Sequence, residues 1–121
     1  VTIVATGHLV WEALKASENL SEKGINSEII NIHTIKPLDE EIILESVSKT
    51  GCLVSAEEHN IYGGLGESIS RLLATKMPTP QEFVGTKDTF GESGTPKQLM
   101  DKYGLNSSSV YQSVINVLKR K

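Results

Sequence analysis

The chain has 121 residues, of which 38% are hydrophobic and 22% charged, and its formal net charge is −3. This length suits one domain with a sizeable core, and the mixture of acids and bases excludes the basic face that a general nucleic-acid binder needs. Cys52 is the only cysteine, which excludes an internal disulfide; this and the absence of a signal-like segment or a bilayer-length apolar run favour a cytoplasmic protein that does not bind membranes.

Strands and helices are predicted to alternate from the first residue. Val1–Ala5 is a continuous apolar run that is typical of a strand covered on both faces. Apolar residues with a period near 3.6 then predict a helix from about Leu9 to Lys23. A second strand is expected over Ser27–Ile35. The helix after it should be capped by Asp39 and end before Gly51.

The second half of the chain repeats this pattern. It predicts strands at Cys52–Glu57 and Gln81–Thr86, with a helix at Leu65–Lys76 between them. Two short helices, at about Pro96–Tyr103 and Ser108–Lys119, should follow a polar loop. Such alternation predicts an α/β fold with a mostly parallel sheet of four or five strands in one domain, residues 1–121. Because the chain begins in mid-strand without an initiator Met, we interpret it as a piece of a longer protein.

Ligands of open α/β sheets bind outside the carboxyl ends of the strands. Three segments are expected at this edge: Thr6–His8, Glu57–Gly66 and Lys87–Gly94. We take each in turn as a candidate site.

The glycines after the third strand raise the possibility of a phosphate cradle. Gly64 and Gly66 supply the first half of a G-x-G-x-x-G fingerprint, but the pattern breaks after Gly66, and the segment has no lysine. Glu57 and Glu58 also bring negative charge, and two like charges about 4 Å apart repel by roughly 1 kcal/mol even in water. The residues therefore argue against a nucleotide site.

The Glu57-Glu58-His59 run raises the possibility of acid/base chemistry. Alternation along a strand puts Glu57 and His59 on one face and Glu58 on the other, and no nucleophile or converging metal ligand lies nearby in sequence. A hydrolase using Cys52 or Ser55 as its nucleophile is a further alternative, but both residues lie inside the apolar strand. We interpret the glycines as permitting close helix–strand packing, and the acids as serving a helix dipole or a subunit contact.

Two other positions carry weaker signals. His8 begins a helix, where it either contributes to an anion site or is an exposed first-turn residue. The loop "KDTFGESG", with Asp88 and Phe90, is typical of a contact with a neighbouring domain or subunit rather than of catalysis. A small-ligand-binding or regulatory module, with an anion at the helix start after Gly7 or Gly64, remains an alternative function.

Four segments together resemble a known family. In order they read "TIVATG…EAL", "INIHTIKPLD", "EEHNIYGGLGESI" and "DTFGESGTPKQLMDKYGL". The chain, from Val1 to about Val117, is similar to the C-terminal domain of transketolases, in particular of the split, two-subunit enzymes of archaea and many bacteria. The same domain occurs in 1-deoxyxylulose-5-phosphate synthase and in the β subunits of 2-oxoacid dehydrogenases, which remain alternatives.

The resemblance implies a fold and a reaction. Such enzymes of the pentose phosphate pathway transfer two-carbon ketol units between sugar phosphates, using thiamine diphosphate and a divalent metal, usually Mg²⁺. One other domain binds the diphosphate and metal, and a second binds the aminopyrimidine. The C-terminal domain is a three-layer α/β/α sandwich with one antiparallel strand, which would precede Val1. It binds no cofactor or metal, so we expect the isolated domain to be inactive.

The resemblance also implies partners: the pyrimidine-binding and diphosphate-binding domains or subunits, in a parent homodimer. It transfers no catalytic residue, and His8 stands where many relatives have a small residue such as Ser. The candidate interface or regulatory residues are Glu57, Glu58, His59, Gly63, Gly64, Gly66, Asp88, Phe90 and His8.

Overall fold

The computed structural model of the chain describes residues 1–33, 37–60, 64–86, 98, 101–102 and 104–121. Within them four strands form one sheet, in the order β2-β1-β3-β4, and every neighbouring pair is parallel. The strands are β1 (Thr2–Ala5), β2 (Glu28–Asn31), β3 (Leu53–Asn60) and β4 (Gln81–Thr86). The helices are α1 (Leu9–Ser21), α2 (Glu40–Thr50), α3 (Leu65–Lys76) and α5 (Ser107–Lys119).

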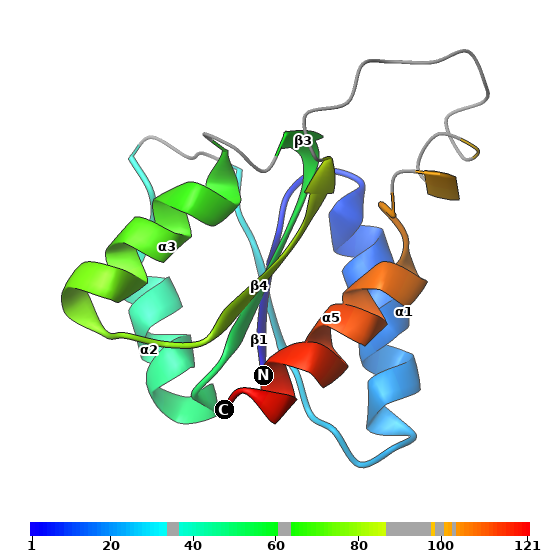
Figure 1. Cartoon of the computed structure of the whole chain (residues 1–121), viewed down its shortest axis with the longest axis horizontal. Coiled ribbons are helices and arrows are strands. Elements are labelled where there is room, and N and C mark those ends of the chain that lie inside the picture. The colour runs from blue at the N-terminus through cyan, green and yellow to red at the C-terminus, as the bar shows by residue number, and fades with distance from the viewer. Residues whose placement is uncertain (34–36, 61–63, 87–97, 99–100, 103) are drawn as a thin grey trace.

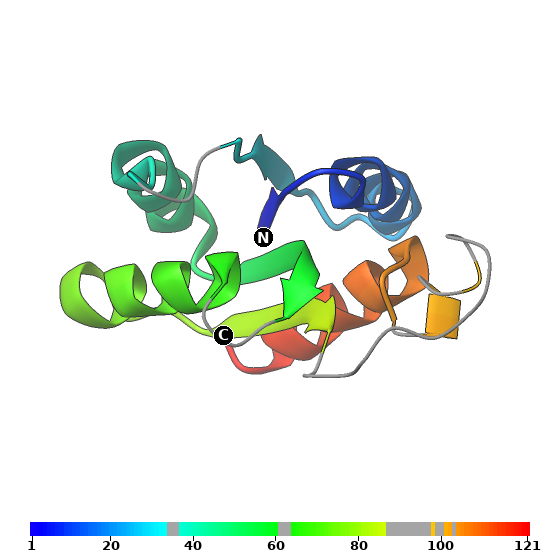
Figure 2. The ribbon, with the colours of Figure 1, turned by 90° about the horizontal axis from the view of Figure 1, so that it is seen from above.

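The helices cover both faces of the sheet (Figures 1 and 2), which confirms the predicted three-layer α/β/α sandwich. α1 and α5 pack on one face, where Ile3, Val54 and Val114 belong to the same buried cluster. α2 and α3 pack on the other face around a second cluster that includes Val4 and Ile69. β1 is central, and its burial on both sides explains why its sequence is a continuous apolar run.

The boundaries differ from the prediction in places. β2 has four residues, shorter than the expected Ser27–Ile35, whose last two residues lie outside the described residues. β3 runs to Asn60, three residues past the predicted end, because a register shift against β4 after Ala56 lets pairing resume at Asn60. α1 ends at Ser21, before the predicted Lys23.

Other expectations concern the two ends of the chain. The predicted helix at Pro96–Tyr103 lies mostly outside the described residues. α5 begins one residue before the prediction, because Asn106 caps it by accepting the backbone N–H of Ser109 at 3.0 Å. The antiparallel strand expected before Val1 stays a prediction.

At the amino ends of the strands, a polar network joins α2 to the sheet. The Thr2 hydroxyl lies 2.7 Å from both the Ser46 and Thr50 hydroxyls, and Ser46 donates to a Glu28 carboxylate oxygen at 2.7 Å. Lys49 Nζ lies 2.9 Å from the other Glu28 oxygen. The hydrogen bonds from Ser46 and Lys49 hold the pKa of Glu28 below its usual value, and Glu28 raises the pKa of Lys49.

Candidate functional site at the carboxyl edge of the sheet

The carboxyl edge is the end of the sheet where each strand leads into a helix. At the start of α3 the Glu57 carboxylate accepts two backbone N–H groups, those of Leu65 at 2.9 Å and Gly66 at 2.7 Å. First-turn N–H groups have no partner within their own helix, so a carboxylate satisfies them and complements the helix dipole. The N-cap residue Gly64 has no side chain to do this. Glu57 is therefore the cap of α3.

Glu58 serves a different helix. Its Oε1 accepts the backbone N–H of His8 at 2.9 Å, immediately before α1. Gly7 has a φ of 55°, and a Cβ placed on it would lie 3.5 Å from the Glu58 carboxylate. The two neighbouring glutamates thus reach helices on opposite faces of the sheet, as alternation along the strand predicted.

Glu12 in α1 performs the same role for α5. Its Oε1 accepts the backbone N–H of Ser107 at 3.2 Å, and its Oε2 lies 3.2 Å from Lys15 Nζ and 4.0 Å from His8 Nε2. No local sequence pattern indicates this role of Glu12, because its partner lies 95 positions further along the chain. The predicted cap of α2 is confirmed: Asp39 accepts the N–H of Ile42 at 3.4 Å.

A carboxylate of the chain therefore lies at the start of each of the four described helices. In α/β proteins that bind phosphates, this is where the ligand would accept hydrogen bonds from the helix. Here a phosphate would have to displace a resident negative charge or approach it closely. The geometry agrees with the sequence in arguing against a nucleotide site.

Gly66 allows α3 to approach the sheet closely. A Cβ at this position would lie 2.5 Å from Phe83 Cδ2 and 2.8 Å from Ser55 Oγ, well inside contact distance. Gln81 closes the same junction by donating to the Gly66 carbonyl at 3.0 Å and to Ser55 Oγ at 3.2 Å. This is the close helix–strand packing that the glycines predicted.

Two of the candidate interface residues need correction. Glu57 is 1% exposed and Gly66 is also buried. Neither is presented to a neighbouring domain, because both take part in the packing of α3 on the sheet. Of the two roles left open for the acids, Glu57 has the helix-terminal one.

The remaining candidates stand as follows. Glu58 is exposed, and the His8 side chain is 54% exposed. Gly64 is half-buried at the start of α3. The side chain of His59 and the positions of Gly63, Asp88 and Phe90 lie outside the described residues.

The described residues also bear on the other kinds of site considered. Cys52, directly before β3, and Ser55, within β3, are fully buried, so neither is exposed as a hydrolase nucleophile would be. The part of the chain that the structure describes contains no group of three or more His, Cys, Asp or Glu side chains able to hold a metal ion. No helix among the same residues is long and apolar enough to cross a membrane.

Fold and site together define a class: a parallel three-layer α/β domain whose carboxyl edge is filled by its own carboxylates. The family model for the transketolase C-terminal domain matches residues 1–110. The chain belongs to this family.

Relatives and solved structures agree with this assignment. The chain is 44% identical over its full length to a 6-deoxy-6-sulfo-D-fructose transketolase subunit of Clostridium sp. strain MSTE9. It is 39% identical to a putative transketolase C-terminal section of Methanocaldococcus jannaschii. It covers 38% of the length of each. It is also 38% identical to a 1-deoxy-D-xylulose-5-phosphate synthase of Desulforudis audaxviator, over 93% of this chain and 18% of that protein.

The solved structure of a split gene transketolase, described as an inactive β4 tetramer, matches with a TM-score of 0.94 and 41% identity. The match covers 98% of this chain and 39% of that one. A transketolase from Pichia stipitis shares the fold at a TM-score of 0.71 and 21% identity.

Proposed function

We propose that the chain is the C-terminal domain of a split transketolase, which transfers two-carbon ketol units between sugar phosphates. In this proposal the domain supplies structure and subunit contacts, while other domains bind thiamine diphosphate and Mg²⁺. The observation that carries it is the occupation of all four described helix starts by Glu57, Glu58, Glu12 and Asp39. The similarity to transketolase subunits that are more than twice as long supports the same interpretation.

The residues at the carboxyl edge do not fit the family's cofactor. A diphosphate needs cations or free backbone N–H groups, and this edge offers carboxylates that already accept those groups. Its metal would need converging oxygen ligands, and the described residues contain no group of three or more His, Cys, Asp or Glu side chains able to hold one. In this proposal the domain therefore has no direct part in holding thiamine diphosphate.

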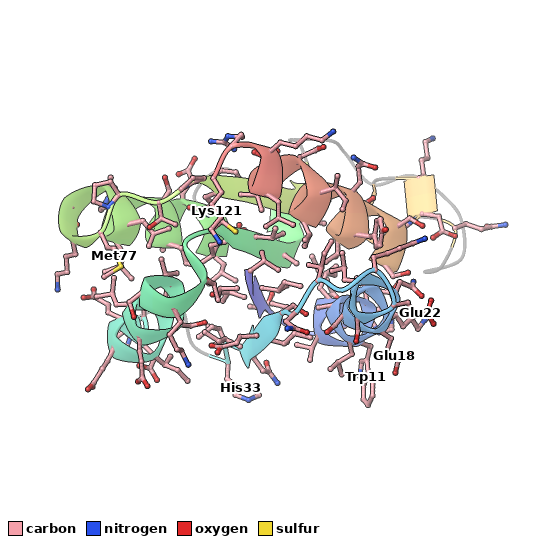
Figure 3. The ribbon with its side chains drawn as sticks, turned by 90° about the horizontal axis from the view of Figure 1, so that it is seen from below. Trp11, Glu18, Glu22, His33, Met77 and Lys121 are labelled. Carbon is pink, nitrogen blue, oxygen red and sulfur yellow. The ribbon has the colours of Figure 1, made fainter. Side chains whose placement is uncertain are left out.

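The proposed partners are the pyrimidine-binding and diphosphate-binding domains or subunits of a cytoplasmic, homodimeric enzyme of the pentose phosphate pathway. Exposed candidates for these contacts are Glu58 and His8, and His59, Gly63, Gly64, Asp88 and Phe90 remain proposals on sequence grounds. The outer side of α1 adds Trp11, which is 64% exposed, and Leu14, which is 43% exposed. Figure 3 shows the Trp11 ring projecting away from the body of the molecule.

The test is a calorimetric titration of the 121-residue chain with thiamine diphosphate in the presence of Mg²⁺. We expect no binding by the chain and saturable binding by the complete enzyme. A thermal-shift screen with sugar phosphates and nucleotides should leave the melting temperature of the chain unchanged. Saturable binding of any of these ligands would instead favour the ligand-binding regulatory module.

A second assay separates the transketolase from the related synthase. The complete enzyme should transfer ketol units between sugar phosphates and should not form 1-deoxy-D-xylulose 5-phosphate. Formation of 1-deoxy-D-xylulose 5-phosphate would instead indicate that the parent enzyme is a synthase like the Desulforudis relative.

A further inference from the structure

The outer side of α1 carries an exposed apolar pair. Trp11, the only tryptophan of the chain, is 64% exposed, and Leu14 is 43% exposed. Residues three positions apart are neighbours on a helix surface, so the two side chains form one apolar patch. Tryptophan is enriched among the residues that contribute most to protein–protein binding, where its ring leaves water only in the complex.

Two glutamates continue the same side of α1 toward its C-terminus. Trp11, Leu14, Glu18 and Glu22 follow one another at intervals of three or four residues, which places them on one stripe, called here the α1 stripe. Figure 3 shows Trp11, Glu18 and Glu22 projecting outward from the helix. Both glutamates are exposed, and neither carboxylate forms an ion pair with another described residue.

The position of these glutamates is unfavourable in the free chain. Glu18 lies in the last turn of α1 and Glu22 is its C-cap, where the negative end of the helix dipole favours cations. They are also four residues apart, so their like charges repel. Lys23 follows in the turn but forms no ion pair with a described residue.

The last turn of α1 thus differs from those of the other described helices. It contains no basic residue. Each of the other three helices has a lysine in its last turn: Lys49 in α2, Lys76 in α3 and Lys119 in α5. A local arrangement that opposes the stability of the fold is typical of a functional surface.

The charge of the α1 stripe indicates which kind of partner it fits. An anionic membrane surface or a nucleic acid would bring further negative charge to Glu18 and Glu22. A second copy joined through the same stripe would add two more acids to the contact. A protein surface with lysine or arginine side chains would instead supply the cations that this end of α1 lacks.

We propose that the α1 stripe binds a basic surface with an apolar pocket on the remaining part of the parent enzyme. The pocket would accept the Trp11 ring, with Leu14 at its margin. Along the helix axis, Glu18 and Glu22 lie about 10 and 16 Å beyond Trp11. The lysine or arginine side chains of the partner are therefore expected at these two separations from the pocket.

This inference rests on the proposed function, because it assigns the partner to the enzyme of which the chain is one domain. The chain spans 38% of the length of its transketolase relatives. More polypeptide therefore lies outside it than within it in such an enzyme, and this supplies a source for the basic surface.

The first part of the test is the stability of the isolated chain with Glu18→Lys and Glu22→Lys combined. Two cations at the C-terminal end of α1 complement the helix dipole, so the melting temperature should rise by roughly 1–5 °C. A fall would overturn the inference, because the two acids would then stabilise the free chain. The same measurement shows that the double variant folds.

The second part is hydroxyl-radical labelling of Trp11, read by mass spectrometry. In the complete enzyme, Trp11 should react at least about fivefold more slowly than in the isolated chain. The charge reversal should bring its rate back to within about twofold of the isolated chain. Glu41→Lys combined with Glu45→Lys makes the same change at the same spacing on exposed positions of α2, and should leave the protection intact.

The outcomes separate this inference from the proposed function. An enzyme that assembles and transfers ketol units, but whose Trp11 reacts as fast as in the isolated chain, overturns the inference alone. Protection that survives the charge reversal also overturns it, because the partner would not be basic. Protection of the isolated chain by phosphatidylglycerol vesicles would assign the stripe to a membrane surface instead. An enzyme that protects Trp11 but transfers no ketol units counts against the proposed function.

Discussion

Glu57 and Glu58 are neighbours in β3, yet their carboxylates cap α3 and α1 on opposite faces of the sheet. The pleat of the strand alone produces this arrangement, because consecutive side chains point to opposite faces. Two adjacent acids would repel if they shared a face. Here each is compensated by the positive end of a different helix dipole.

Replacing Glu57 by Gln should destabilise the chain by about 2–3 kcal/mol, because a neutral amide loses charge-assisted bonds and places its NH₂ against a backbone N–H. Urea unfolding of both proteins measures the difference. The matched control is Glu58→Gln, one residue away and solvent-exposed, which should cost less than about 1 kcal/mol. Equal losses for the two variants would contradict the roles assigned here.

Gly66→Ala should destabilise the chain by about 1–3 kcal/mol despite the better helix propensity of Ala. The added methyl would lie 2.5 Å from the Phe83 ring and 2.8 Å from Ser55 Oγ. Combining it with Phe83→Ala removes the closest contact, so the double variant should lose less stability than the sum of the losses of the two single variants. Additive effects would show that α3 can move away from the sheet at little cost.

Glu28→Gln should lower stability at neutral pH and have little effect at strongly acidic pH. The pKa of Glu28 is lowered in the folded chain by the hydrogen bonds from Ser46 and Lys49. Its stabilising contribution is therefore present above the usual glutamate pKa of about 4.3, and is lost as pH falls through the lower folded value.

Urea unfolding of wild type and Glu28→Gln across the acidic range measures this convergence. Salt should also reduce the difference in unfolding free energy between wild type and Glu28→Gln, because the Glu28 and Lys49 side chains are 44% and 58% exposed and salt screens their interaction. A difference that is independent of pH would contradict the assignment.

Trp11→Ser should change the stability of the chain by less than about 0.5 kcal/mol, although it removes the largest side chain of α1. The ring is 64% exposed, so little of its surface leaves water on folding. Leu20→Ala, on the buried face of the same helix, should cost about 2–5 kcal/mol. Thermal and urea unfolding of the two variants provide the comparison, and a large loss for Trp11→Ser would show that the ring packs within the chain.

The sequence was a good guide wherever the determining pattern is local. The continuous apolar run of β1, the Asp39 cap and the opposite faces of Glu57 and Glu58 depend on periods of two or 3.6 residues and on short-range capping. The glycine at position 66 was also interpreted correctly as a point of close packing, although only the structure shows that Phe83 and Ser55 set the limit.

Contacts between distant segments could not be predicted in this way. Glu12 looks like an ordinary helical glutamate until the fold brings Ser107 to it. The extension of β3 to Asn60 depends on a register shift against β4, for which a single strand carries no signal. Glu57 was expected at a surface because it lies near the end of a strand, and its burial follows from the position of α3.

The carboxylates at the helix starts make it harder to convert the carboxyl edge of this domain into a ligand-binding site. In a phosphate-binding α/β protein, the favourable interaction between a helix start and negative charge forms only when the ligand binds. Here the same attraction is already used in the free chain, and it stabilises the fold instead of a complex. Converting this edge into a ligand site would therefore require two gains at once: a new source of stability for α1 and α3, and new contacts for the ligand.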